Sequence, residues 1–327
     1  DPNSATAHFN FGAAYFNKGL VDEAIEEFKR ATELDPSDAE VRCNLAAAYS
    51  SKGLLDRAIG EYQRAKELNP NDAKVHSDLG AAYITKGWVD EAIKEFKRAI
   101  ELNSSLAVAH YNLGDVYGSK GLVDQAIIEL KRAVELDPNL EDAHYKLGLA
   151  YVNKGWIDKA VTEFRRAIEL NPRDERAHDN LGVAYTNKGW IDKAIAEHKQ
   201  AIELNASMAI AHYNLGVAYA MKGLLDEAIA EFKRTIELNP NDAMAHFNLG
   251  ATYGSKGLVD QAIAELNCAI ELNPKLAEAH YNLAAAYYIS KRFDMAWKHV
   301  RIAEKLGLSA QAINQLIDML RMVSNEP

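Results

Sequence analysis

Histidines are the residues of this 327-residue chain whose type and spacing most directly suggest chemistry. Eight of the ten recur at multiples of 34 residues, which would suggest metal binding because imidazole nitrogens are common zinc ligands. The eight are His8, His76, His110, His144, His178, His212, His246 and His280. Each is expected on a helix of its own, and packed helices lie about 8–10 Å apart, whereas zinc needs its ligands about 2 Å from one point. We therefore interpret the row as structural and predict no metal site.

Other patterns that could support catalysis lack the surroundings that catalysis needs. Residues 118–121 and 254–257 both read Gly-Ser-Lys-Gly, but no strand precedes them as in a phosphate-binding loop. Cys43 and Cys268 lie more than six repeats apart and are not expected to form a disulfide. His198 stands where other repeats carry an aromatic core residue, and we interpret it as a tolerated substitution. Because no nucleophile has a base beside it, we predict a non-catalytic protein without a cofactor.

The amino-acid composition restricts the classes of molecule that the chain is expected to bind. The chain has 37 basic and 47 acidic residues and a net charge of −10, which excludes a broad basic surface for nucleic acid or anionic lipid. No apolar run approaches the roughly 18 residues that a membrane span needs, and no signal-peptide pattern opens the chain. We therefore expect a cytoplasmic protein whose partner is another protein or a peptide.

The elements that position these residues follow from the 34-residue period. Eight glycines keep it strictly, and seven of the eight prolines share one register. The glycines are Gly19, Gly53, Gly87, Gly121, Gly155, Gly189, Gly223 and Gly257. Glycine allows the left-handed conformation that ends a helix, and proline cannot continue one. Two helices of about a dozen residues fit between these stops, so the period predicts an array of helical hairpins.

Within a repeat, numbered 1 to 34 from Ala5, apolar and small residues share one face of each helix. The first helix is expected to bury positions 4, 7, 8 and 11, and the second positions 20, 21, 24 and 27. In repeat 1 these are His8, Phe11, Gly12, Tyr15, Ala24, Ile25, Phe28 and Ala31. Asp at position 18, such as Asp22, is predicted to cap the second helix, and Lys at position 14 to complement the dipole of the first. The charges of Glu27, Lys29, Arg30 and Glu33 are expected on a solvated outer face.

This pattern resembles the tetratricopeptide repeat, whose motif places these residue types at these offsets. The matching copies are residues 5–38, 39–72, 73–106, 107–140, 141–174, 175–208, 209–242, 243–276 and 277–308. The resemblance implies an all-α fold, a right-handed superhelical α-solenoid of stacked antiparallel helix hairpins, with the first helix of each repeat lining a concave groove. Residues 1–4 match the end of a preceding repeat, which suggests a fragment of a longer array. Residues 309–327 are expected to form a capping helix and tail, with Ile313, Leu316, Ile317 and Leu320 on one face.

Position 6 of the first helix is the strongest candidate for binding. Seven repeats carry Asn there, although its amide competes with the helix backbone. These residues are Asn10, Asn44, Asn112, Asn180, Asn214, Asn248 and Asn282. An amide offers a donor and an acceptor, which matches a peptide unit, and the row is similar to the asparagine ladder of O-linked N-acetylglucosamine transferase. The amides could instead bridge adjacent helices, or be inherited through recent duplication.

Position 5 adds aromatic rings on the same side. The rings either pack between neighbouring helices or form an aromatic wall for a ligand, and both could hold. The candidate ring residues are Tyr111, Tyr145, Tyr213, Phe247 and Tyr281. Met221 and Met244 lie near them in the last third of the chain, where we expect an apolar anchor site.

We therefore predict a protein–protein interaction scaffold that binds an extended peptide segment of a partner. Two alternatives remain open at this point: the substrate-recruiting region of a larger glycosyltransferase, and a scaffold that associates with itself end to end. A carboxylate clamp of the kind found in chaperone-binding relatives is excluded, because no repeat has Lys at position 5 or Asn at position 9.

Overall fold

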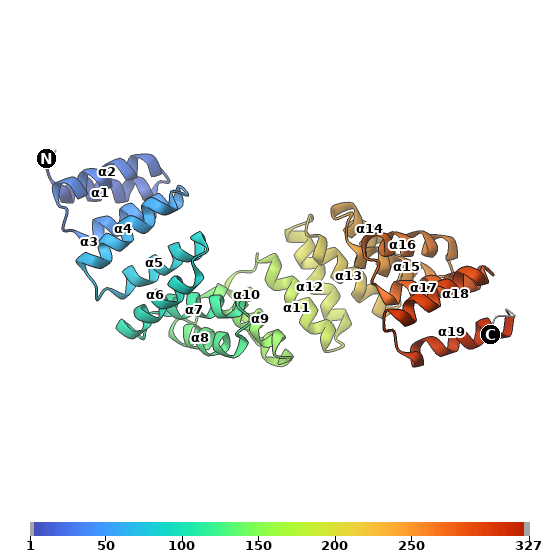
Figure 1. Ribbon diagram of the computed structural model, residues 1–327. Coiled ribbons are helices and arrows are strands. Elements are labelled where there is room, and N and C mark those ends of the chain that lie inside the picture. The colour runs from blue at the N-terminus through green and yellow to red at the C-terminus, as the bar shows by residue number, and fades with distance from the viewer. Residues whose placement is uncertain (1–2, 324–327) are drawn as a thin grey trace. The chain divides into compact units, whose positions relative to one another are not determined.

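The computed structural model describes residues 3–323, which fold into α-helices with no strand among them (Figure 1). The helices are α1 (Ala5–Asn17), α2 (Val21–Leu34), α3 (Ala39–Ser51), α4 (Leu55–Leu68), α5 (Ala73–Lys86), α6 (Val89–Leu102), α7 (Ala107–Ser119), α8 (Val123–Leu136), α9 (Glu141–Asn153), α10 (Ile157–Leu170), α11 (Glu175–Asn187), α12 (Ile191–Leu204), α13 (Ala209–Lys222), α14 (Leu225–Leu238), α15 (Ala243–Ser255), α16 (Val259–Leu272), α17 (Ala277–Ile289), α18 (Phe293–Lys305) and α19 (Ala310–Val323). Within the described residues, none of these helices has the length and apolar character needed to cross a bilayer.

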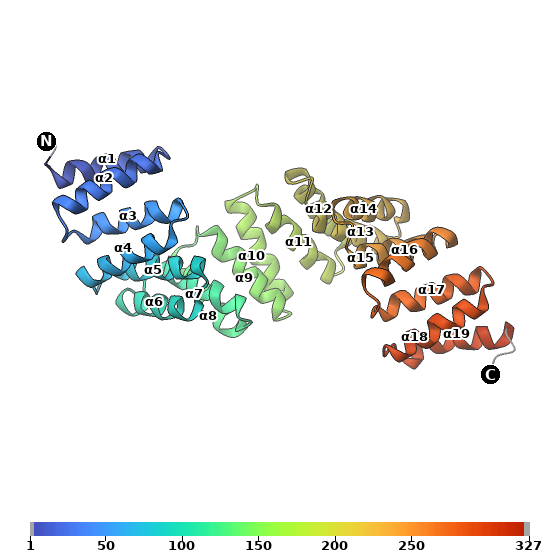
Figure 2. The ribbon, with the colours of Figure 1, turned by 45° about the horizontal axis from the view of Figure 1, so that its top comes forward.

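The chain divides into two compact units, Asp1–Arg166 and Ala167–Pro327. In each unit an odd-numbered helix, here called an A helix, packs against the even-numbered B helix that follows it, as α1 does with α2 and α13 with α14 (Figure 2). B helices also pack against the A helix that follows, as α2 does with α3 and α14 with α15. This succession of stacked hairpins confirms the predicted all-α solenoid architecture.

Glycine closes the turn between the two helices of a hairpin. The eight glycines at position 15 have φ between 72° and 84°, a left-handed conformation that L-residues rarely adopt. In the ninth repeat Lys291 takes the same conformation with φ 60°. The amide of the next residue then donates back across the turn, as Leu20 does to the carbonyl of Tyr15. The predicted stop signal is therefore correct, and the turn persists where the glycine has been replaced.

The predicted cap at position 18 is wrong. Helix α2 begins at Val21 with Leu20 as N-cap, so Asp22 lies inside the first turn, where it complements the helix dipole. Its carboxylate pairs with Lys52 at the end of the next A helix, and Asp56 and Asp90 make the same pairing with Lys86 (2.8 Å) and Lys120 (2.9 Å). Lys120 hydrogen-bonds to Asp90 and lowers the pKa of its carboxyl. The aspartates and the position-14 lysines thus link successive repeats, although exposed pairs of this kind contribute little to stability.

Aspartate does cap helices at position 34, which the sequence analysis missed. The carboxylates of Asp38, Asp72, Asp174 and Asp242 each accept two backbone N–H groups from the first turn of the following A helix. In these four repeats the hairpin therefore begins at a capped A helix and closes at the glycine turn.

The core of each hairpin lies where position 8 of the A helix meets position 24 of the B helix. A Cβ atom added at Gly80 would lie 2.6 Å from the Phe96 ring, and one added at Gly216 would lie 2.8 Å from Phe232. The close approach at these positions therefore depends on a small residue, which is glycine in seven repeats and alanine in two. Phe11 departs from the predicted buried face and is 59% exposed, since no described B helix precedes α1 to cover it.

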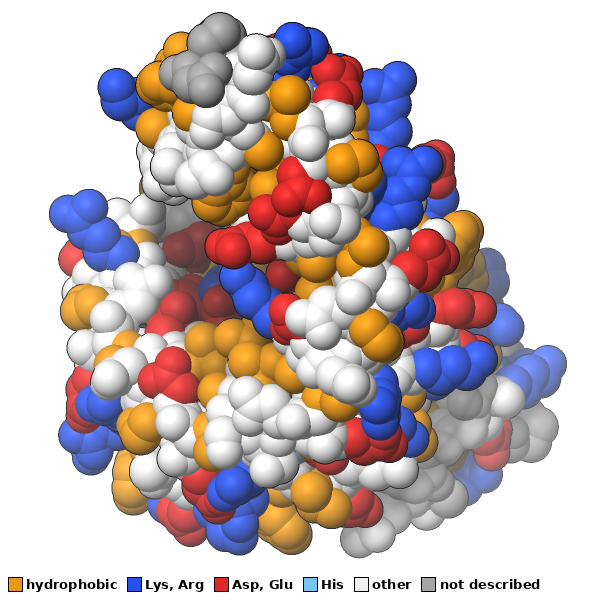
Figure 3. All heavy atoms as spheres, turned by 90° about the vertical axis from the view of Figure 1, so that its left-hand side faces the viewer, with side chains coloured by type: hydrophobic (Ala, Val, Ile, Leu, Met, Phe, Trp, Pro, Cys, Tyr) orange, Lys and Arg blue, Asp and Glu red, His pale blue; other side chains and the backbone are white. Residues whose placement is uncertain are grey.

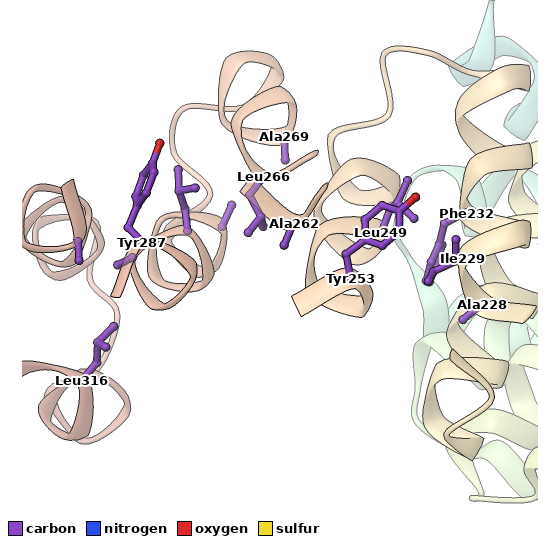
Figure 4. Packing of buried hydrophobic residues seen from close by; sticks show 14 of the residues in the cluster. Ala228, Ile229, Phe232, Leu249, Tyr253, Ala262, Leu266, Ala269, Tyr287 and Leu316 are labelled. Carbon is purple, nitrogen blue, oxygen red and sulfur yellow. The ribbon is translucent and has the colours of Figure 1, made fainter. Parts of the chain in front are cut away.

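Helix α19 covers the last apolar face of the second unit. Ile313, Leu316 and Leu320 are buried and join the cluster that runs back through Tyr287, Leu266 and Phe232. Figure 4 shows Leu316 on this helix and the other core side chains directed into the spaces between helices. Ile317 is only partly buried, but the predicted capping helix is confirmed.

The histidine row connects the two helices of each hairpin. In seven repeats the Nδ1 atom of the position-4 histidine lies 2.5–2.7 Å from a carboxylate oxygen of Glu at position 23. In most of these repeats the Nε2 atom also lies within 3.3 Å of the backbone carbonyl six residues earlier, as His76 does with Pro70. In repeat 2 Arg42 reaches the same two partners, Glu61 and the carbonyl of Pro36. Glu27 and its equivalents therefore bind the A helix and do not belong to the predicted solvated face.

Repeat 9 lacks this glutamate, and we expect it to be sensitive to acid. Its position 23 is His299, whose Nδ1 lies 2.9 Å from Nδ1 of His280. Burial, and then the proximity of His280 and Lys298, lowers the pKa of His299 to about 4. Because protonation is easier in the unfolded chain, this histidine contributes stability that is complete above pH ~6.5 and is lost as the pH falls toward 4. Amide hydrogen exchange of α17–α19 should accelerate over that range, with a loss on the order of 2 kcal/mol.

The matched variant is His299→Glu, which restores the pairing of the other repeats. It should remove this acid-dependent opening. His178 provides an internal contrast, because its hydrogen bond with Glu197 raises the pKa of its imidazole. The contribution of His178 to stability is therefore present below pH ~6.5 and declines as the pH rises through the raised pKa. Identical exchange profiles for the parent chain and His299→Glu between pH 7 and 4 would contradict the assignment.

Candidate functional site

The A helices of each unit offer a surface formed by their positions 2, 5, 6, 9, 12 and 13, here called the A-helix surface. In the second unit α11, α13, α15 and α17 contact one another in order, and in the first unit α1 contacts α3 while α7 contacts α5 and α9. All seven position-6 asparagines lie on this surface, where each is exposed or half-buried. The structure thus places the predicted asparagines in register along neighbouring helices.

Two of the asparagines bridge adjacent A helices. The Asn214 amide donates to both carboxylate oxygens of Asp179 at 3.2 and 3.0 Å, and the Asn248 amide donates to the Tyr213 hydroxyl at 2.9 Å. In each case the acceptor is position 5 of the preceding repeat. These amide nitrogens hold the helices together, and the amide oxygens have no partner among the described residues.

The other asparagines divide into two groups. Asn44 and Asn180 donate to the carbonyl four residues earlier in their own helices, at 2.9 Å. Asn10, Asn112 and Asn282 form no hydrogen bond with any described residue. The last three amides therefore keep both a donor and an acceptor available.

Three of the six position-5 rings lie against the core ring of their own hairpin. Phe9, Tyr145 and Tyr213 each pack with their ring centroid 6.0 Å from the position-24 ring of the same repeat. Tyr145 is buried, whereas Tyr213, Phe247 and Tyr281 are half-buried and pack against the apolar cluster of the second unit. Tyr111 is half-buried in the first unit. The rings thus combine packing with a partly exposed edge on the A-helix surface.

Exposed apolar side chains also occur on α13 and α15. Ile210 is 51% exposed, Met221 57% and Met244 41%. Ile210 and Met244 both occupy position 2, on α13 and α15 respectively. Apolar surface of this kind supplies binding energy when it is covered by a partner.

Two equivalent pockets open onto the A-helix surface, one in each unit and four repeats apart. The first, of about 230 Å³, is lined by α7, α8 and α9, and the second, of about 320 Å³, by α15, α16 and α17. Both occur where position 12 is glycine (Gly118, Gly254) and position 24 is Leu in place of an aromatic ring (Leu130, Leu266). The first carries the ion pair Asp115–Lys146 (2.7 Å) at its edge, and the second carries Asn282.

A more polar hollow of about 470 Å³ lies between α1, α3 and α5. Its lining includes Cys43 and Asp78. Burial is the main cause that raises the pKa of the Asp78 carboxyl, and burial raises the pKa of the Cys43 thiol to about 12. A thiol with so high a pKa stays protonated and is a poor nucleophile.

One buried network was missed by the sequence analysis. His198 is fully buried, with Nδ1 2.7 Å from Oδ1 of Asp179, which also accepts from Asn214. In repeats 1, 5 and 7 positions 5 and 24 both carry aromatic rings that pack together. Repeat 6 replaces both members of this contact. The sequence signal that could have revealed this network is that positions 5 and 24 both change in repeat 6. Our interpretation of His198 as an isolated tolerated substitution was therefore incomplete.

Charge on the visible surface is mixed. Figure 3, which looks onto the end of the first unit near the N-terminus, shows basic and acidic side chains interspersed over this face. Lys29 pairs with Glu26 at 2.8 Å and Arg30 with Glu33 at 3.2 Å on the exposed side of α2. Such a surface gives no extended area of one sign to steer a polyanion.

Comparisons with known proteins agree with this geometry. The family model described as "TPR repeat" matches residues 14–53, 48–87, 82–121, 114–155, 151–189, 184–223 and 255–289. Models described as "Tetratricopeptide repeat" match residues 209–242 and 231–264. No curated protein matches the chain.

Solved structures show the same fold. YrrB, described as a TPR protein with an unusual peptide-binding site, is 28% identical with a TM-score of 0.52, over 56% of this chain and 95% of YrrB. A chain of the APC/C hetero-tetramer Cut9–Hcn1 is 23% identical with a TM-score of 0.60, over 81% of this chain and 52% of that chain. PilF of Pseudomonas aeruginosa is 19% identical with a TM-score of 0.58, over 65% of this chain and 96% of that chain.

Proposed function

Because the chain belongs to the tetratricopeptide repeat family and is a protein-interaction scaffold, we propose that its A-helix surface binds an extended segment of a partner protein. The proposed contacts are the position-6 amides, the position-5 rings and the apolar side chains near them. These residues are Asn10, Asn44, Asn112, Asn180, Asn214, Asn248, Asn282, Tyr111, Tyr145, Tyr213, Phe247, Tyr281, Met221 and Met244.

The observation that carries the proposal is the position of Asn282 at the edge of the second pocket. Its amide has no partner among the described residues, and the pocket beside it is lined by Leu266, Val259 and Ile289. A free amide pairs with the N–H and C=O of a peptide unit, and an adjoining apolar pocket accepts the side chain of the same residue. Backbone hydrogen bonds with a few apolar anchors are how extended peptides are recognised.

Two further observations support an extended ligand. The amide oxygens of Asn214 and Asn248 are oriented by the bonds that their nitrogens make, so they present acceptors to backbone N–H groups. The exposed Ile210 and Met244 continue the apolar surface along α13 and α15. Affinity should depend on these anchors more than on the area covered.

We expect Asn282→Ala to weaken binding without weakening the fold. A ligand peptide selected from a random library against the whole chain would serve as the probe, with its affinity measured by fluorescence anisotropy. Loss of one or two hydrogen bonds at about 1 kcal/mol each should reduce the affinity roughly 5- to 30-fold, while the melting temperature stays unchanged because the amide has no internal partner. Asn248→Ala should reduce both affinity and stability, since its amide also binds Tyr213.

The matched control is Asn267→Ala, which changes an asparagine of α16 that donates to the Ile263 carbonyl of its own helix. It should leave the affinity for the selected peptide unchanged. An unchanged affinity of Asn282→Ala, or cross-links from the peptide that map to B helices, would refute binding on the A-helix surface.

A further inference from the structure

Repeat 8 differs from the other repeats at the edge of its histidine–glutamate pair. Position 26, one helical turn after the glutamate, is Arg in six repeats, Gln in the sixth and Ile in the ninth. In repeat 8 it is Cys268. The substitution removes a cation and adds a thiol on the face of α16 that already carries Glu265.

The three side chains of this repeat converge. The Nδ1 atom of His246, on α15, lies 2.7 Å from Oε2 of Glu265, and Glu265 and Cys268 are three residues apart on α16, so they share a face. One ligand atom from each of the three residues lies within 4.8 Å of the other two. All three side chains are half-buried, so an ion can reach them from solvent.

We propose that His246, Glu265 and Cys268 form a binding site for Zn²⁺ or a similar divalent transition-metal ion. Imidazole nitrogen, carboxylate oxygen and thiolate sulfur are the ligands that zinc takes in proteins, and three of them leave a fourth position for water. His246 also has the supporting contact typical of such ligands: its Nε2 lies 3.3 Å from the Pro240 carbonyl, which favours a proton on Nε2 and leaves Nδ1 to coordinate.

Coordination requires small movements and releases a proton. Zinc bond lengths of about 2.0–2.3 Å place tetrahedral ligand atoms roughly 3.3–3.7 Å apart, so the Glu265 carboxylate must move away from Nδ1 and the Cys268 sulfur must approach. Thiolate sulfur coordinates only after the thiol has lost its proton, so metal binding should release a proton and weaken as the pH falls.

The other histidine–glutamate pairs provide the comparison. Repeat 7 has the same pair, His212–Glu231 at 2.6 Å, but its position 26 is Arg234, which forms an ion pair with Glu237 at 2.9 Å. A guanidinium there supplies no ligand and repels a cation. Repeat 8 is therefore the one place on the histidine row where we propose a departure from the prediction of no metal site. The spacing Glu-x-x-Cys on one helix was the signal in the sequence.

The test is a titration of the untagged full chain with Co²⁺, which reports thiolate coordination through a sulfur-to-cobalt absorption band. One equivalent should bind with this band, and Zn²⁺ should displace it. Cys268→Arg, which restores the residue common at this position, should abolish the band and reduce Zn²⁺ affinity at least 100-fold with an unchanged circular dichroism spectrum. Cys43→Ser should leave both unchanged.

A variant that should gain a second metal site completes the test. Arg234→Cys places a thiol beside His212 and Glu231 and should add a second equivalent of Co²⁺ with the same band. Failure of the parent chain to develop the band, its persistence in Cys268→Arg, or the lack of a second equivalent in Arg234→Cys would each overturn the proposal.

Discussion

Replacing Asp179 by alanine is expected to destabilise the second unit by about 3–5 kcal/mol, the range found when one partner of a buried ionisable pair is removed. Asp179 is 4% exposed and His198 is fully buried. The substitution removes the 2.7 Å contact to Nδ1 of His198, whose Nε2 already has no hydrogen-bond partner. An imidazole would then remain in the core with neither nitrogen satisfied, and the Asn214 amide would lose its acceptor as well.

Asp115→Ala is the matched control. Asp115 is also an acidic residue of an A helix with one close partner, Lys146 at 2.7 Å, but both side chains are about one-third exposed. Its loss should change the stability by less than about 1 kcal/mol. Urea denaturation gives the size of each effect, and amide hydrogen exchange shows whether the loss for Asp179→Ala is centred on α11–α13.

Restoring the aromatic pair should reverse the effect. In repeat 7 the equivalent positions hold Tyr213 and Phe232, with ring centroids 6.0 Å apart. The double substitution Asp179→Tyr with His198→Phe should leave the chain as stable as the parent or stabilise it by about 1–4 kcal/mol, because well-packed apolar residues often replace a buried ionic pair without loss. The new hydroxyl would accept from Asn214, as Tyr213 accepts from Asn248. A loss for Asp179→Ala no larger than that for Asp115→Ala would show that the pair contributes little.

The sequence was sufficient to predict the hairpins, because the signals that define them are local. Two of these signals depend only on the backbone of a single repeat: glycine at position 15, which takes the left-handed conformation, and a small residue at position 8. Both predictions agree with the structure. The capping helix was also predictable, since Ile313, Leu316 and Leu320 recur at helical spacing and must be covered.

Apart from the local caps at position 34, the errors arose where a side chain has a partner in another helix. Asp22 was assigned to its own helix, but it pairs with Lys52 thirty residues later. Glu27 was placed on a solvated face, but it binds His8 nineteen residues earlier. A helical wheel gives the face on which a residue lies, whereas the choice of partner depends on how neighbouring helices stack. The two bridging asparagines depend on a residue of the preceding repeat in the same way, since Asn214 donates to Asp179 and Asn248 to Tyr213.

Gly216→Leu is the second large effect that we expect, with a destabilisation of about 3 kcal/mol or more from overpacking. A Cβ atom at Gly216 would already lie 2.8 Å from the Phe232 ring, which is 1% exposed and has no free space to enter. No repeat carries a residue larger than alanine at position 8. Loss of the cooperative urea transition of the second unit, or a large decrease in its midpoint, is the expected measurement.

Two further variants separate overpacking from a general intolerance of glycine replacement. Gly60→Ala, in α4, meets nothing within 4 Å and should stabilise its helix by up to about 1 kcal/mol through helix propensity. Gly216→Ala should destabilise, and adding Phe232→Val should recover part of the loss, because repeat 9 accommodates this combination as Ala284 and Val300, both buried. Equal stabilisation by Gly216→Ala and Gly60→Ala would show that the close contact between positions 8 and 24 does not require glycine. The distance between the two helices of a hairpin would then depend on the alanines at positions 20 and 27.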